Sequence, residues 1–171
     1  MTCLSSIRLK SLIILVLTLV ASWTAGAGPA DRRHAVRPQG SVDMSLTQPD
    51  VQVTLETIKI PNDFVYKDAL LWGGDTGFLP ASVVSAIRVR QGARKLFVPM
   101  SAYSDLGDVH SAALLPDPSG FILNLYGGET ATTYKAQLRF ANGYLLSRVV
   151  SSGEFPQNAR EETRYSFPKD D

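Results

Sequence analysis

Two segments place an acidic residue after an aromatic residue and two glycines, and they are the strongest candidates for chemistry in this sequence. Residues 71–76 read Leu-Trp-Gly-Gly-Asp-Thr, and residues 125–130 read Leu-Tyr-Gly-Gly-Glu-Thr. Their aromatic and acidic members are Trp72, Asp75, Tyr126 and Glu129. Paired glycines allow a ligand to approach the backbone, where the acid can form a hydrogen bond with it.

Two interpretations of these segments are open. Two carboxylates about 5–10 Å apart would serve glycoside hydrolysis, and the two aromatic rings would offer a platform for a sugar. Alternatively, both segments are strand ends that turn on glycine and continue with a solvated polar residue. The sequence therefore predicts a carbohydrate-binding or carbohydrate-active protein only as the second of two functions.

The sequence lacks the residues that most other kinds of catalytic site require. The chain has two histidines, His34 and His110, and one cysteine, Cys3. Asp108 and His110 would share one face of a strand, but no Gly-x-Ser-x-Gly motif supplies a nucleophile for them. Zinc sites use mainly histidine and cysteine, and the spacing of calcium-binding and phosphate-binding loops is absent. The sequence therefore argues against an enzyme and predicts no metal and no cofactor.

Five further residues are of the types that protein interfaces favour. Lys135, Arg139, Tyr144 and Arg148 are predicted on the outer face of one hairpin, and Phe155 follows in a loop. Aromatic residues and arginine are enriched at interfaces. Long basic side chains also cover solvated sheet faces, and a loop phenylalanine often packs into the core instead. We predict these residues as candidates for binding a partner.

The hairpin that positions four of these residues is the clearest structural signal. Residues 132–151 alternate apolar and polar side chains around Asn142-Gly143, which favours a two-residue turn with positive φ at both positions. A turn of this length fixes the register of the strands. The predicted opposite pairs are Ala141–Tyr144, Phe140–Leu145, Leu138–Ser147 and Ala136–Val149. This register turns Arg148 towards solvent, together with Lys135 and Arg139.

The same alternation recurs along most of the chain from Val51 onward. Val51, Val53 and Leu55 alternate with polar residues, and turns that contain proline or glycine separate the later runs. About nine runs read as strands, and only residues 101–108 favour a short helical turn. Short strands joined by tight turns predict an all-β fold, either an antiparallel sandwich or a barrel-like meander. The predicted single β-domain spans residues 51–168.

The first 50 residues do not continue this pattern. Residues 1–27 combine a basic start, an apolar run and a small-residue end, which is typical of a secretory signal peptide cut after Ala27. An uncleaved membrane anchor is the alternative, because residues 11–30 carry no charge. Residues 28–50 are rich in polar residues, glycine and proline, and they predict a flexible arm.

Charge and export restrict the partners. The full chain has a net charge of +1, and cleavage after Ala27 would remove Arg8, Lys10 and the single cysteine. A near-neutral chain offers no basic footprint for nucleic acid. We therefore predict a periplasmic or secreted, non-catalytic domain that spans no membrane after cleavage. Its predicted partner is a protein, favouring an inhibitor-like or immunity-like role in the bacterial envelope.

Overall fold

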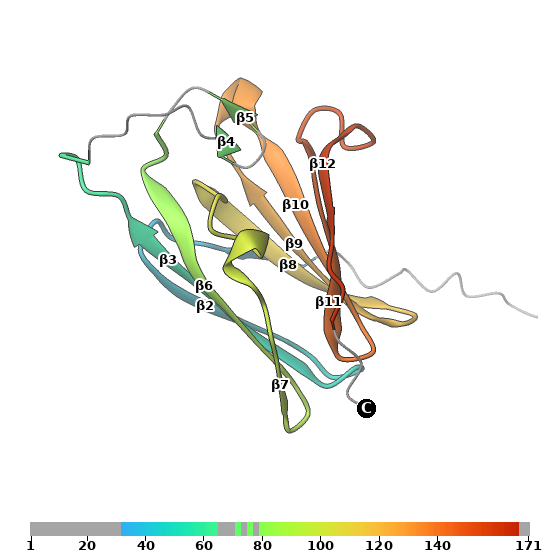
Figure 1. The fold of residues 1–171 in the computed structure, drawn as a ribbon. Coiled ribbons are helices and arrows are strands. Elements are labelled where there is room, and N and C mark those ends of the chain that lie inside the picture. The colour runs from blue at the N-terminus through green and yellow to red at the C-terminus, as the bar shows by residue number, and fades with distance from the viewer. Residues whose placement is uncertain (1–31, 65–70, 73–74, 77–78, 168–171) are drawn as a thin grey trace, which may run out of the picture.

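The computed structural model describes residues 32–64, 71–72, 75–76 and 79–167, and the predicted signal peptide lies outside these residues. A six-stranded and a four-stranded antiparallel sheet form the body of the protein, and two further strands form a small ribbon (Figure 1). The predicted all-β antiparallel fold is therefore confirmed. None of the described helical segments has the length and apolar character that a membrane crossing requires.

The large sheet has the strand order β1-β8-β9-β10-β11-β12. From β8 onward, neighbours in this sheet are also neighbours in the sequence, as in a meander. Its strands are β1 (Arg33–Ala35), β8 (Val109–Asp117), β9 (Gly120–Gly127), β10 (Tyr134–Ala141), β11 (Tyr144–Ser152) and β12 (Ala159–Arg164). Short 3₁₀ turns at Met100–Ala102 and Thr130–Thr132 precede β8 and β10.

The small sheet has the strand order β2-β3-β6-β7. Its strands are β2 (Gly40–Leu46), β3 (Val51–Lys59), β6 (Ser82–Gln91) and β7 (Arg94–Leu96). The alternation predicted from Val51 onward is confirmed, because Val51, Val53 and Leu55 of β3 are all buried. The two-stranded ribbon consists of β4 (Leu71–Trp72) and β5 (Asp75–Thr76).

Side chains from both sheets build one apolar core. Phe121 of β9 stacks on Phe140 of β10 with ring centroids 4.6 Å apart. Leu138 of the large sheet and Leu55 of the small sheet are both fully buried. Burying one such side chain contributes about 1.5–3 kcal/mol. Apolar burial between the sheets therefore holds the described domain together.

Residues 33–35 and 40–46 of the predicted flexible arm (28–50) form β1 and β2, so the prediction was wrong for these residues. β1 pairs with β8, and β2 pairs with β3 along its whole length, so each sheet gains an edge strand. Val42, Met44 and Leu46 of β2 pack against the core at alternate positions. Their alternation is short and is flanked by glycine, proline and polar residues, which hid the strand in the sequence.

The β10–β11 hairpin turns where the sequence predicts. Asn142 and Gly143 have φ values of 54° and 79°, the positive values that this turn requires. Register next to the turn is also confirmed. The two predicted pairs found there are Ala141–Tyr144 and Phe140–Leu145.

Farther from the turn, the predicted register is wrong. A β-bulge leaves Leu146 of β11 without an opposite residue, so Leu138 lies opposite Arg148 and not Ser147. Ala136 likewise lies opposite Val150. One extra residue reverses the faces of the rest of a strand. Arg148 therefore points into the interior.

Candidate functional site

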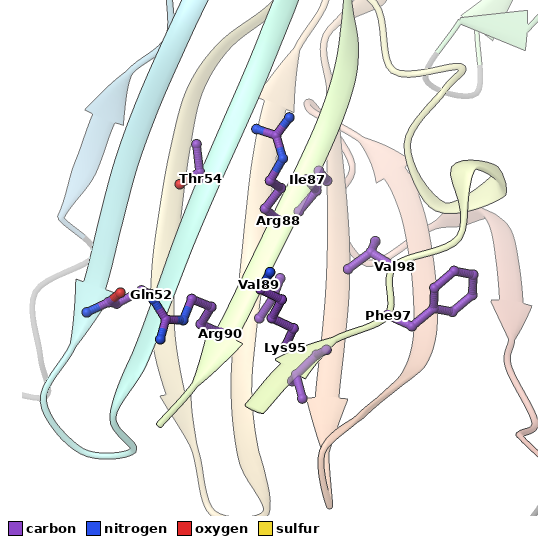
Figure 2. A pocket seen from close by; sticks show the side chains of 10 residues that line it. Gln52, Thr54, Ile87, Arg88, Val89, Arg90, Lys95, Phe97 and Val98 are labelled. Atoms are coloured by element: carbon purple, nitrogen blue, oxygen red, sulfur yellow. The ribbon is translucent and has the colours of Figure 1, made fainter. Parts of the chain in front are cut away.

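A groove of about 320 Å³ runs along the β6–β7 end of the small sheet (Figure 2). Buried Ile87 and Val89 alternate along β6 with exposed Arg88 and Arg90. β7 pairs with β6 over only three residues, and the chain beyond Leu96 forms the second wall. This β6–β7 groove is lined by Gln52, Thr54, Ile87, Arg88, Val89, Arg90, Lys95, Leu96, Phe97 and Val98.

Three cations and no acid line the β6–β7 groove. Arg88 forms an ion pair with Glu56 of β3, and this hydrogen bond raises the pKa of the Arg88 guanidinium. Arg90 lies opposite Lys95, and neither has an ion-pair partner among the described residues. Like charges at opposite positions of a sheet repel each other. The groove therefore keeps positive charge that the fold does not neutralise.

Three aromatic rings continue this surface towards the large sheet. Phe97 is 68% exposed, and its ring meets that of Phe167 edge-on with centroids 6.4 Å apart. Phe167 stacks on Tyr144 of β11 at a centroid distance of 5.2 Å. The guanidinium carbon of Arg94 lies 5.0 Å from the centroid of the Tyr144 ring. We call Phe97, Tyr144 and Phe167 the aromatic cluster, which joins the edge of the β6–β7 groove to β11.

The structure separates the residues that were predicted to share one hairpin face. Tyr144 belongs to the aromatic cluster. Lys135 and Arg139 lie on the outer face of β10, where Arg139 forms an ion pair with Asp117 at 3.2 Å. Phe155 lies in the loop between β11 and β12 and is 53% exposed. Of these candidates, Tyr144 is the one that contributes to the surface beside the groove.

Arg148 is 2% exposed, so its predicted solvent-facing position was wrong. The bulge turns its side chain inwards, where the guanidinium donates to Asp105 at 2.5 Å and also to Glu161 of β12. A buried charge needs such partners, because an unpaired one is costly in the interior. Arg148 therefore ties β11 to β12 and to the segment that precedes β8.

Tyr134 is a second buried polar group close to this ion-pair cluster. Its hydroxyl donates to the backbone carbonyl of Gly107 at 2.7 Å. Burial raises the pKa of the Tyr134 hydroxyl far above its usual value, and the nearby carboxylates of Asp105 and Asp108 raise it further. The Tyr134 hydroxyl therefore holds its proton and serves as a structural donor.

The described residues of the two segments that share the Gly-Gly-acid-Thr pattern belong to different kinds of element. In the first, Trp72 lies opposite Asp75 in the β4–β5 ribbon, and their side chains lie outside the description. In the second, Glu129 starts a 3₁₀ turn, and its backbone N–H donates to Thr132 Oγ1 at 3.2 Å. The guanidinium carbon of Arg33 lies 3.9 Å from the centroid of the Tyr126 ring. The sequences therefore share the pattern, but the acidic residues lie in a strand in one segment and at the start of a 3₁₀ turn in the other.

Asp108 and His110, the pair that the sequence places on one strand face, have separate hydrogen-bond partners. Asp108 accepts hydrogen bonds from the backbone N–H groups of Ala81 and Ser82, at 3.2 and 3.0 Å, and it does not orient His110. His110 is exposed, and its Nδ1 lies 3.2 Å from Ser111 Oγ. Within the described ranges, no three His, Cys, Asp or Glu side chains gather as metal ligands would.

Sequence reasoning missed the residues of the groove. The alternating Arg88 and Arg90 indicate a shared outer face, and that signal could have found them. The sequence does not reveal that β7 is the edge of a sheet or that Phe167 packs against Phe97. Both facts depend on contacts between residues far apart in the chain.

The β6–β7 groove and the aromatic cluster together present an exposed surface of aromatic and cationic side chains. A fold alone does not define a function, so a function has to follow from the chemistry of this surface. Comparison with protein-family models, with curated proteins and with solved structures finds no match to this chain.

Proposed function

We propose that this protein is an exported, non-catalytic β-domain that binds a protein of the bacterial envelope through the β6–β7 groove and the aromatic cluster. The observation that carries the proposal is Phe97, which is 68% exposed, contacts the ring of Phe167 and lines the same groove as Arg90 and Lys95. Aromatic residues and arginine dominate the energetic centres of protein interfaces. Phe97 does not stand alone, because Phe167 and Tyr144 continue its apolar surface, and contiguous apolar surface with a polar rim is typical of interaction sites.

The side chains of the groove favour binding over catalysis. General acid–base catalysis needs groups that exchange protons near neutral pH. The groove lining supplies arginine and lysine, without a carboxylate or an imidazole. These cations suit charge-assisted contacts with a partner.

Partner capture with single variants tests this proposal. The exported protein is immobilised and exposed to envelope extract, and retained proteins are identified by mass spectrometry. We expect a stoichiometric partner that is lost with Phe97→Ala, because that change removes the exposed ring without disturbing the core. The matched control is Ile58→Ala, since Ile58 is also exposed at 52%. A partner that Phe97→Ala retains as well as the wild type would contradict the proposal.

Phe155→Ala distinguishes the groove from the other candidate surface. Phe155 is 53% exposed in the β11–β12 loop, so its replacement also leaves the core intact. We expect the partner to be retained by this variant. Loss of the partner with Phe155→Ala but not with Phe97→Ala would move the interface to the loop.

Export is tested by the N-terminus of the protein recovered from cells. The proposal expects mass spectrometry to find a chain that begins at Gly28, because the small residues before it suit a signal peptidase. An intact Met1 on membrane-bound protein would contradict cleavage and support an anchor.

The carbohydrate alternative is tested by titration with cell-wall and plant glycans. Stoichiometric capture of a protein, without a glycan-dependent shift in melting temperature, would eliminate this alternative. A shift that disappears in Asp75→Asn or Glu129→Gln would replace the proposed function.

A further inference from the structure

The cations of the β6–β7 groove form a row along one face of β6. Arg88 and Arg90 occupy alternate positions of the strand, so their Cα atoms lie about 6.6 Å apart along it. Lys95 lies opposite Arg90 on β7, so all three side chains share one face of the sheet, and Figure 2 shows them among the residues that line the groove. Arg88 is 63% exposed in its pair with Glu56, so a carboxylate from outside can exchange with Glu56 at little cost.

The other wall of the groove is apolar. Val98 points towards β6 and packs against the core, whereas Phe97 points away from β6 in Figure 2 and is 68% exposed, so Phe97 offers the main apolar contact at the rim of the groove. The volume of about 320 Å³ is near the lower limit of ligand sites, which is about 300 Å³. The groove therefore fits a few side chains with both charged and apolar character.

We infer that the β6–β7 groove binds an extended, acidic segment of the partner protein, an inference that rests on the proposed function. Alternate side chains of an extended peptide repeat every ~6.6 Å, the spacing of Arg88 and Arg90. Carboxylates at alternate positions of the segment pair with these two arginines, and Lys95 adds a contact to the carboxylate at Arg90. An apolar side chain of the segment packs on Phe97.

A peptide binding assay tests this inference. The probe is a fluorescently labelled, ten-residue peptide with glutamate at alternate positions and one tyrosine, titrated against the exported protein at low ionic strength. We expect affinity to fall at least about tenfold in Arg90→Gln/Lys95→Gln, because both unneutralised cations are removed. Rising ionic strength should also weaken binding. The matched control, Arg139→Gln/Arg164→Gln, removes two exposed charges from the large sheet and should bind as the wild type does.

Several outcomes would overturn the inference. One is equal binding of the same peptide with glutamine in place of glutamate, and another is unchanged affinity in the groove variant. Tighter binding of a sulfated oligosaccharide of equal charge would assign the groove to an anionic glycan. Partner capture that depends on Phe97 but not on Arg90 and Lys95 would overturn this inference and leave the proposed function intact.

Discussion

Arg148 and Arg90 both lie on strands, but Arg148 is buried and paired with acids, whereas Arg90 is exposed. Arg148 on β11 is 2% exposed, and its guanidinium meets the carboxylates of Asp105 and Glu161. Arg90 on β6 is exposed and lies opposite Lys95, without an acid partner among the described residues. A buried charge requires a counter-ion, whereas an exposed charge is stabilised by water. The comparison separates cations that hold the fold together from cations that remain available to a partner.

Replacing Arg148 has the largest expected effect on this comparison. Arg148→Ala leaves two carboxylates without their counter-ion and opens a cavity, and we expect it to lower the free energy of unfolding by about 2–3 kcal/mol. Partial exposure of Asp105 and Glu161, 30% and 38% of their side chains, keeps the loss below that of a fully buried pair.

Urea denaturation measures this loss, and Arg90→Ala is the matched control. We expect the control to change the free energy of unfolding by about 0.5 kcal/mol or less, because an exposed side chain contributes little to folding. Equal losses for Arg148→Ala and Arg90→Ala would show that the two arginines do not differ as the comparison states.

Gly143 lies where the β10–β11 hairpin meets the β6–β7 hairpin. Its φ is 79°, and a Cβ there would lie 2.6 Å from Arg94 Nη1. We expect Gly143→Val to lower the free energy of unfolding by about 1–2 kcal/mol, because a β-branched residue resists positive φ and Arg94 must move. Gly92→Val is the control, since Gly92 also has positive φ but open space around it. Thermal denaturation should show the greater loss for Gly143→Val, and an unchanged melting curve would refute this role of Gly143.

Tyr134 is a buried polar group, like Arg148, and it should make the stability of the protein depend on pH in the alkaline range. Because its pKa is raised by burial, the folded protein keeps the hydroxyl proton at pH values where the unfolded chain releases it. Its contribution is therefore complete below the ordinary tyrosine pKa of about 10 and is lost as pH rises above it. Tyr134→Phe should cost about 1 kcal/mol at neutral pH through the hydrogen bond to Gly107.

The pH dependence of Tyr134→Phe checks this reasoning. We expect a smaller decline in stability above pH ~10 than in the wild type, measured by urea denaturation at several pH values. The variant should still show part of the decline, because it keeps Tyr165, whose pKa is also raised by burial. Identical alkaline declines in the two proteins would contradict a buried, proton-holding Tyr134.

Lys95→Gln has the smallest expected effect on the free energy of unfolding, and it should raise this energy where the other changes lower it. Removing the positive charge opposite Arg90 relieves repulsion across the strand pair, and we expect the free energy of unfolding to rise by about 0.2–0.5 kcal/mol. The same change should weaken binding of the acidic peptide, because Lys95 supplies a positive charge to the groove. A charge that lowers stability can thus be retained for binding. A loss of stability would show that Lys95 serves the fold.

Local sequence patterns predicted the parts of the fold that depend on neighbouring residues. The alternation of β3 and the Asn142-Gly143 turn were correct because each is set by side chains adjacent in the chain. The strand at residues 40–46 was missed because its alternation covers few residues in a polar context. Its pairing with β3 supplies the stability that the local sequence does not indicate.

The candidate site depends on features that local patterns do not encode. The bulge at Leu146 reversed the expected face of Arg148, and nothing in the alternation of β11 marks an extra residue. Tyr144 was predicted as a binding residue, but its contacts with Phe167 and Arg94 arise only when the two sheets pack together. The β6–β7 groove likewise requires knowledge of the strand order.

Photocrosslinking in the producing cells tests whether the aromatic cluster contacts a partner protein. A photoreactive phenylalanine analogue in place of Phe97 reports which molecule contacts the aromatic cluster, and the same analogue in place of Phe155 is the control, since both side chains are exposed. We expect one discrete protein adduct from position 97 and none from position 155. An adduct from position 155 alone, or no adduct from either position, would contradict this expectation.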